Sequence, residues 1–150
     1  MSTHYSGTEA EMRTLDAYIK LSRSADVVSQ QINDHLRSFD LTISQFGVLE
    51  ALYYLGPMQT GELGGKILKS SGNMTLVIDN LSKRDLVYRQ RREDDRRCID
   101  IHLTAAGQAL VEQIWPIHVA GVVRTFEPLS PAEQEQLAAL CRKLGLGQSE

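Results

Sequence analysis

The sequence predicts a mainly α-helical fold that carries one small β-ribbon. Apolar residues follow helical spacing over most of the chain, but the pattern changes to alternation at both ends of a charged segment, residues 92–97. With 150 residues and 42% hydrophobic content, the chain is large enough to bury the core of a single domain. We therefore treat residues 1–150 as one subunit.

The first half of the chain predicts three helices. Residues 10–38 carry apolar side chains at helical intervals without any Pro or Gly, which indicates one long helix. A second helix begins after an N-cap at Thr42 or Ser44 and ends at Gly56–Pro57. A short, glycine-rich helix follows over residues 60–68.

The segment 71–84 predicts an amphipathic helix. Its apolar residues lie at i, i+3, i+4 and i+7, which places them on one inward-facing side: Met74, Val77, Ile78 and Leu81. The opposite side carries small and hydrogen-bonding residues: Gly72, Thr75, Leu76, Asp79, Asn80 and Lys83. That outer side has the groups to meet a nucleic-acid groove, although exposure to solvent explains most of it equally well.

Alternation of apolar and polar residues predicts two strands, 87–91 and 99–103. The segment between them, Arg92-Glu93-Asp94-Asp95-Arg96-Arg97, is too polar to be buried and is expected to form an exposed loop. A helix that can enter a major groove, followed by a ribbon tipped with arginines, is the layout of a winged helix-turn-helix. We assign residues 41–103 to this winged part.

The last third of the chain predicts two more helices, within residues 105–145. Thr104 can cap the first, and Pro116 should bend it or remove one backbone hydrogen bond. Ser130-Pro131-Ala132-Glu133 supplies an N-cap and a capping box for the second, which Gly145 should end. The apolar faces of helices 10–38 and 105–145 exceed what the winged part can cover, so we expect them to form a homodimer.

Four motifs resemble the MarR family of transcriptional regulators in both order and spacing. They are Thr75-Leu-Val-Ile-Asp79-Asn-Leu81, Leu86-Val87, Asp95-Arg-Arg97 and Leu103-Thr104-Ala-Ala-Gly107. The sequence departs from the family at Leu76 and Asn80, where a basic residue is common, and at Asp85, where a glycine usually ends the helix. Asp can adopt the left-handed conformation that a helix end often needs.

The resemblance implies a DNA-binding regulator, expected to repress transcription at a pseudo-palindromic operator. The residues expected to contact DNA lie on helix 71–84, at its start and in the wing: Ser70, Ser71, Asn73, Thr75, Leu76, Asn80, Lys83, Arg91, Arg92, Asp95, Arg96 and Arg97. In the family's wing motif the arginine that corresponds to Arg97 reaches the minor groove, and Asp95 is expected to orient it.

The resemblance also implies a pocket for a small phenolic or other aromatic effector between the dimerisation helices and the winged part. The candidates combine aromatic area with a few polar groups: Tyr18, Arg23, His35, Phe46 and Trp115. Phe46 and Trp115 fit a role in the hydrophobic core better than a role as ligand contacts.

Charge is compatible with a DNA partner despite a net charge of -3. Between residues 66 and 97, nine Lys or Arg stand against five Asp or Glu, a local charge of +4. The acidic total leaves open a second interpretation, a winged-helix module that binds other proteins. A third is a redox regulator that uses Cys98, whose pKa the neighbouring Arg96 and Arg97 can lower.

No enzyme signature is present, because the four histidines are scattered and no metal-ligand spacing occurs. We expect no cofactor, no metal and no membrane association. Cys98 and Cys141 are too few and too far apart for a disulfide framework. The start of the chain lacks the apolar segment of a signal peptide, so a cytoplasmic protein is expected.

Overall fold

The computed structural model describes residues 4–67 and 71–147, except for the side chains of residues 71 and 72. Its order is α1 (Glu9–Arg37), α2 (Ile43–Leu55), β1 (Met58–Gln59), α3 (Thr60–Ile67), α4 (Ser71–Lys83), β2 (Val87–Arg91), β3 (Ile99–Leu103), α5 (Ala105–Phe126) and α6 (Pro131–Leu146). The predicted winged helix-turn-helix with long flanking helices is confirmed.

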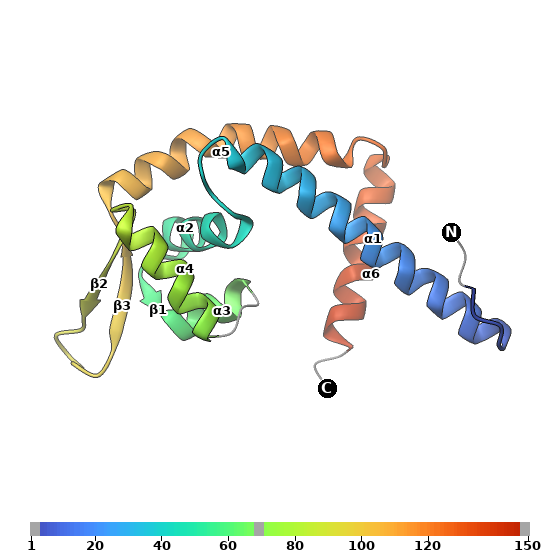
Figure 1. Cartoon of the computed structure of the whole chain (residues 1–150), viewed down its shortest axis with the longest axis horizontal. Helices are drawn as coiled ribbons and strands as arrows, with labels where there is room; N and C mark the ends of the chain where they lie inside the picture. Colours follow the sequence, from blue (N-terminus) through green and yellow to red (C-terminus); the bar gives the residue numbers. More distant parts are fainter. Residues whose placement is uncertain (1–3, 68–70, 148–150) are drawn as a thin grey trace.

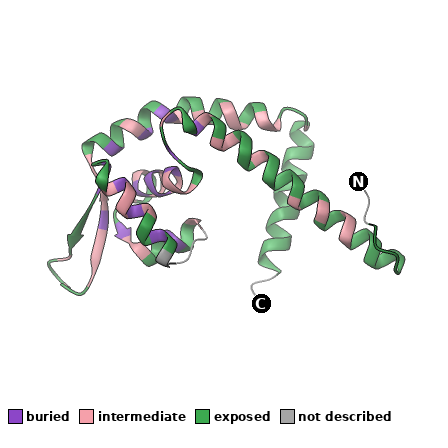
Figure 2. Ribbon diagram, viewed as in Figure 1, coloured by how far each residue is buried: buried purple, intermediate pink, exposed green. Residues whose placement is uncertain are grey.

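The molecule divides into a packed winged part and an extended helical part (Figure 1). Elements α2 to β3 form the winged part, and α1 and α5 pack against each other and continue beyond it (Figure 1). Buried residues concentrate in the winged part and in the adjoining ends of α1 and α5, whereas α6 has none (Figure 2). The core therefore lies next to the β-ribbon and away from the two chain ends.

The predicted inward face of α4 is confirmed. Met74, Ile78 and Leu81 are completely buried, and Val77 packs partly buried against them. They belong to one hydrophobic core with residues from the other elements of the winged part and from α1 and α5, among them Leu36, Phe46, Leu49, Leu63, Ile101, Val111 and Ile114. Burying each such side chain stabilises the fold by about 1.5–3 kcal/mol, so α4 is held firmly from behind while its other side faces outward.

The sheet contains a strand that the sequence analysis did not predict. Its order is β1-β3-β2, antiparallel throughout, with Met58 opposite Ile101 and Tyr88 opposite His102. Strand β1 has only two residues, too short for an alternating pattern to be recognised. It lies directly before α3 and so joins the helix-turn-helix to the wing.

Helix ends follow the predicted caps, with one exception. Thr42 rather than Ser44 caps α2, with Gln45 completing a capping box, and Ser130 caps α6 in the same way. The predicted end of α6 at Gly145 is wrong, because the backbone stays helical to Leu146 and no left-handed residue stops it earlier. Helix α5 runs through Pro116 as one element.

The end of α4 and the start of α5 are tied together by backbone groups. Asp85 takes a left-handed conformation, φ 57°, as predicted, and Leu86 N–H donates to the Leu81 carbonyl at 3.1 Å. Thr104 then donates its hydroxyl to Asp85 O at 2.7 Å and its N–H to Leu86 O at 3.1 Å. A Cβ on Gly107 would lie 2.2 Å from Leu86 O, so only glycine lets α5 approach this closely.

This contact predicts that Gly107→Ala lowers the free energy of unfolding by about 1–3 kcal/mol, since backbone must move to make room. The matched control is Gly65→Ala in α3, where an added Cβ meets no atom within 4 Å. That change should raise stability by about 0.5–1 kcal/mol because alanine favours helix. Urea denaturation of the three proteins measures both values, and a Gly107→Ala protein as stable as its parent would contradict the assignment.

Candidate nucleic-acid interface

The outward face of α4 carries most of the residues expected to contact DNA. Asn73, Thr75 and Lys83 are exposed, and Asn80 is half-buried. Leu76 is 60% exposed, so its apolar side chain is accessible on this face. The structure describes less at two of the expected positions. Ser70 lies outside the described residues, and Ser71 is described only as the first residue of α4.

Helix α4 is joined to the wing by an ion pair that the sequence analysis did not identify. The Asp79 carboxylate, next to the outward face, accepts a hydrogen bond from the Arg89 guanidinium on β2. The sequence could have indicated this ion pair, because side chains two residues apart on a strand share one side. Arg89 therefore lies on the same side of β2 as the buried Val87. The pair links α4 directly to the ribbon.

At the tip of the wing, Asp95 holds Arg97. Asp95 Oδ1 accepts from Arg97 N at 3.1 Å and from Arg97 Nε at 3.2 Å. These bonds lower the pKa of the Asp95 carboxyl, so it stays charged. The Arg97 side chain is nevertheless 91% exposed. Its guanidinium is therefore oriented and also accessible.

The other wing arginines differ from Arg97 in their surroundings. Arg92 makes a bidentate pair with Asp100, Nε to Oδ2 at 2.8 Å and Nη2 to Oδ1 at 2.9 Å, which lowers the pKa of the Asp100 carboxyl. Arg91 donates from Nη1 to the Arg96 carbonyl at 2.8 Å. Arg91 and Arg92 thus form bonds that brace the ribbon, although Arg91 is itself exposed, and Arg96 and Arg97 are exposed at its tip.

The five effector-pocket candidates do not form one group within the chain. Phe46 and Trp115 stack with ring centroids 6.1 Å apart, and His35 joins them through His118, a residue that the sequence analysis missed. His118 follows Trp115 by about one helical turn, so the spacing in the sequence could have placed it on the same face of the helix. Tyr18 and Arg23 are exposed on α1, about 25 and about 18 Å before His35 at the helical rise per residue.

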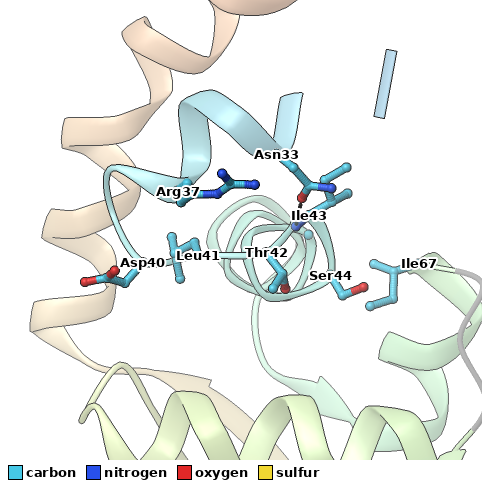
Figure 3. A pocket seen from close by; sticks show the side chains of 9 residues that line it. Asn33, Arg37, Asp40, Leu41, Thr42, Ile43, Ser44 and Ile67 are labelled. Atoms are coloured by element: carbon cyan, nitrogen blue, oxygen red, sulfur yellow. Dashed lines mark hydrogen bonds between the residues drawn. The ribbon is translucent and has the colours of Figure 1, made fainter. Parts of the chain in front are cut away.

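Two hollows border this region. A pocket of about 180 Å³ lies beside Trp115 and is lined by Tyr53, Tyr54, Val111, Glu112, Trp115 and Pro116. A groove of about 770 Å³ is lined by Asn33, Arg37, Asp40, Leu41, Thr42, Ile43, Ser44, Gly47 and Ile67. Figure 3 shows its walls coming from α1, the start of α2 and the end of α3, with Asn33 accepting from the Ile43 N–H.

Other kinds of site find little support in the described part of the chain. Over those residues, no three His, Cys, Asp or Glu side chains gather as a metal site, and no helix is long and apolar enough to cross a membrane. Cys98 and Cys141 are free, and the Cys98 thiol contacts Asp95 Oδ2 at 3.6 Å. The redox interpretation of Cys98 stays a prediction.

Comparison with known proteins identifies the family. A family model described as MarR family matches residues 41–99. The HTH-type transcriptional regulator YkoM of Bacillus subtilis is 34% identical over 134 residues, which cover 89% of this chain and 87% of YkoM.

Two solved structures share the whole architecture. BpsR of Bordetella bronchiseptica, described with its regulation of DNA binding by 6-hydroxynicotinic acid, has a TM-score of 0.79 at 26% identity over 97% of this chain and 98% of its own. Sco3205 of Streptomyces coelicolor, in complex with DNA, has a TM-score of 0.84 at 20% identity over 96% and 91%. With its winged fold, its basic wing tip and these relatives, the chain belongs to the MarR family of DNA-binding transcriptional regulators.

Proposed function

We propose that the chain is a homodimeric repressor that binds a pseudo-palindromic operator and is released by a small aromatic effector. The observation that carries the proposal is the exposed Arg97, oriented by Asp95 at the tip of a braced wing beside α4. BpsR, whose DNA binding is described as regulated by 6-hydroxynicotinic acid, supports the same kind of activity here.

In this proposal α4 lies in the major groove and its N-terminal end, from Ser71, meets a phosphate. Thr75, Asn80 and Lys83 donate or accept hydrogen bonds at base edges or phosphates, and Asn73 lies beside them. The exposed Leu76 contacts a thymine methyl, which gives preference for A·T pairs at that position. A basic residue at 76 would add charge but no such preference.

The wing supplies the second contact, in the minor groove. A narrow minor groove has enhanced negative potential, and the Arg97 guanidinium can enter it in the orientation that Asp95 fixes. Arg96 meets a neighbouring phosphate. Arg91 and Arg92 support the ribbon through their bonds to the Arg96 carbonyl and Asp100, so their effect on DNA is mostly indirect.

The Arg97→Ala variant should lose roughly 1–3 kcal/mol of operator binding while its unfolding is unchanged, since the tip is exposed. Asp95→Ala should lose less, because the positive charge remains. Arg142→Ala on α6 is the control for loss of one charge away from the wing. Binding to the DNA upstream of its own gene and to a scrambled duplex, at about 50 and about 200 mM salt, measures these effects.

Equal affinity of Arg97→Ala and its parent would show that the wing contact is on another arginine. Binding that is absent, or indifferent to both salt and sequence, would reject DNA recognition and favour the protein-interaction module that the acidic net charge leaves open.

Dimerisation is supported by apolar side chains that one chain leaves exposed on α1, α5 and α6. They include Leu21, Val27, Ile117, Val123, Leu137, Leu140 and Leu144. A groove of about 710 Å³ between these helices offers a seat for a second copy. Apolar area of this extent on three adjoining helices is typical of a buried interface.

Light scattering at micromolar concentration should give twice the mass of one chain. Leu140→Glu should shift the protein toward the monomer, because it places a charge in the apolar face of α6. Ala139→Glu, turned about 100° from Leu140 around the same helix and further still from Leu137 and Leu144, should leave the mass unchanged. A monomeric parent protein would reject the dimer, and dissociation by both variants would reject this face as its site.

The effector is proposed to bind where Phe46, Trp115 and the small pocket beside them meet α1 and α5. Ligands regulate only by binding two states unequally, so the effector must prefer a spacing of the two α4 helices that does not fit the operator. The two α4 helices of a dimer address half-sites about one helical turn apart. A small movement of α5 against α2 is enough to disturb that spacing.

An aromatic acid, with 6-hydroxynicotinic acid as the first probe, should weaken operator binding in a concentration-dependent manner. Trp115→Leu should blunt this response because it removes the ring that borders the pocket, whereas Arg23→Ala should keep it. Calorimetric titration measures the affinity of the protein for the probe, and DNA titration measures the effect of the probe on operator binding. A probe that binds but leaves DNA affinity unchanged would defeat the proposal, and loss of response in Arg23→Ala would move the pocket along α1.

A further inference from the structure

Two histidines from distant parts of the chain form a direct hydrogen bond. His35 Nε2 on α1 and His118 Nδ1 on α5 lie 3.0 Å apart, with ring centroids at 5.2 Å. One nitrogen must donate and the other accept, so the neutral pair holds a single proton on this axis. Neither histidine belongs to the outward face of α4 or to the wing.

The histidine pair, His35 and His118, sits where three helices meet. A Cβ on Gly121 would lie 2.6 Å from His35 Nδ1, so the His35 ring lies directly against the backbone of α5. His118 contacts the rings of Phe46 on α2 and Trp115 on α5, at centroid distances of 4.7 and 5.7 Å. A displacement of either imidazole therefore shifts α1 or α2 relative to α5.

The charged groups around the pair are mostly satisfied elsewhere. On α1, Asp34 and Arg37 form an exposed ion pair with each other at 3.4 Å. On α5, Glu112 accepts hydrogen bonds from Tyr53 and Gln108. Glu50, the acidic residue of α2, lines a separate pocket with Lys66. Arg124, in the last turn of α5, adds positive charge.

No carboxylate among the described residues is thus placed to neutralise two imidazolium groups at the pair. Burial and the positive charge of His35 both lower the pKa of His118. A first added proton can be shared, because an imidazolium donates a stronger hydrogen bond to a neutral imidazole. A second added proton brings two cations to hydrogen-bond distance, and Gly121 leaves His35 no room to retreat toward α5.

We propose that the histidine pair is a proton-operated latch between α1 and α5, closed with up to one added proton and open with two. Opening moves α5 against α2, which supports α4, and lowers DNA affinity below the ordinary histidine pKa of about 6.5. Only this last step depends on the proposed DNA binding. Opening itself is a property of the three helices.

The direction of the pH effect separates the latch from general electrostatics. A histidine whose pKa is lowered by folding stabilises the closed state above the ordinary pKa, and that stability is lost as pH falls. Acid makes the whole protein more positive, which by itself strengthens DNA binding. The latch predicts weaker binding in acid, by up to about tenfold for each pKa unit of the shift.

The test compares the full-length parent with His118→Gln and His102→Gln. His102 stacks on Tyr88 in the wing and belongs to β3 rather than to α1 or α5, and so serves as the matched control. DNA affinity is measured at about pH 7.5 and about pH 5.5 on the duplex upstream of its own gene. The parent and His102→Gln should lose affinity in acid, whereas His118→Gln should not.

Histidine NMR titration of the same proteins reports the latch without DNA. In the parent, His35 and His118 should titrate in two steps, the second below the ordinary pKa, and in His118→Gln a single step should remain. Trp115, the only tryptophan, should change its emission at the second step, because a cation then appears against its ring. Should His118→Gln fail to fold, His118→Phe keeps the ring contact with Phe46 and takes its place.

The outcomes separate the two proposals. Equal or tighter DNA binding by the parent in acid overturns the latch and leaves the repressor proposal standing. Absence of DNA binding at both pH values rejects the repressor proposal, and the latch is then decided by NMR and Trp115 emission. Titration of both histidines in one step, or emission that is identical in the parent and His118→Gln, overturns it.

Discussion

The hydrogen bonds of Thr104 are the constraint on which the rest of the structure depends. This residue caps α5, accepts the Gly107 N–H at 2.9 Å, and donates to the backbone of Asp85 and Leu86 just after α4. The left-handed turn at Asp85 brings those carbonyls into reach. This junction therefore joins α5, which leads away from the winged part, directly to the end of α4.

A second constraint comes from the arrangement of ion pairs in the wing. Asp79 holds Arg89 and Asp100 holds Arg92, so two of the basic side chains of this region support the ribbon. Exposed ion pairs contribute little to global stability, about 0–1 kcal/mol each. Their role here is to fix the orientation of the ribbon, which leaves the tip arginines in a defined position relative to α4.

Features of the sequence that depend on neighbours along the chain were predictable, and those that depend on tertiary contacts were not. The apolar stripe of α4, the cap at Thr42 and the turn at Asp85 follow from local spacing and conformational preference. The short strand β1 forms only because β3 is available to pair with it. Arg91 and Arg92, which brace the ribbon, look the same in sequence as Arg96 and Arg97 at its tip.

The candidate effector region illustrates the same limit. Aromatic and polar character selected Phe46, Trp115 and His35, which the fold brings together, but also Tyr18, which lies far along α1. His118 completes the cluster because α5 crosses α1 at Gly121. The sequence of neither helix alone indicates where the two cross. The ring contacts therefore had to come from the structure.

The bidentate pair of Arg92 and Asp100 has a consequence for the thermodynamics of recognition. Ordering a free arginine or a flexible loop at an interface costs conformational entropy, about 0.5–1.5 kcal/mol for each long side chain. In this wing the ribbon is already ordered by the pair, and Asp95 restricts Arg97 before any partner arrives. Binding through this tip therefore carries a smaller entropic penalty than a mobile loop of the same composition would, and favours one geometry of approach over others.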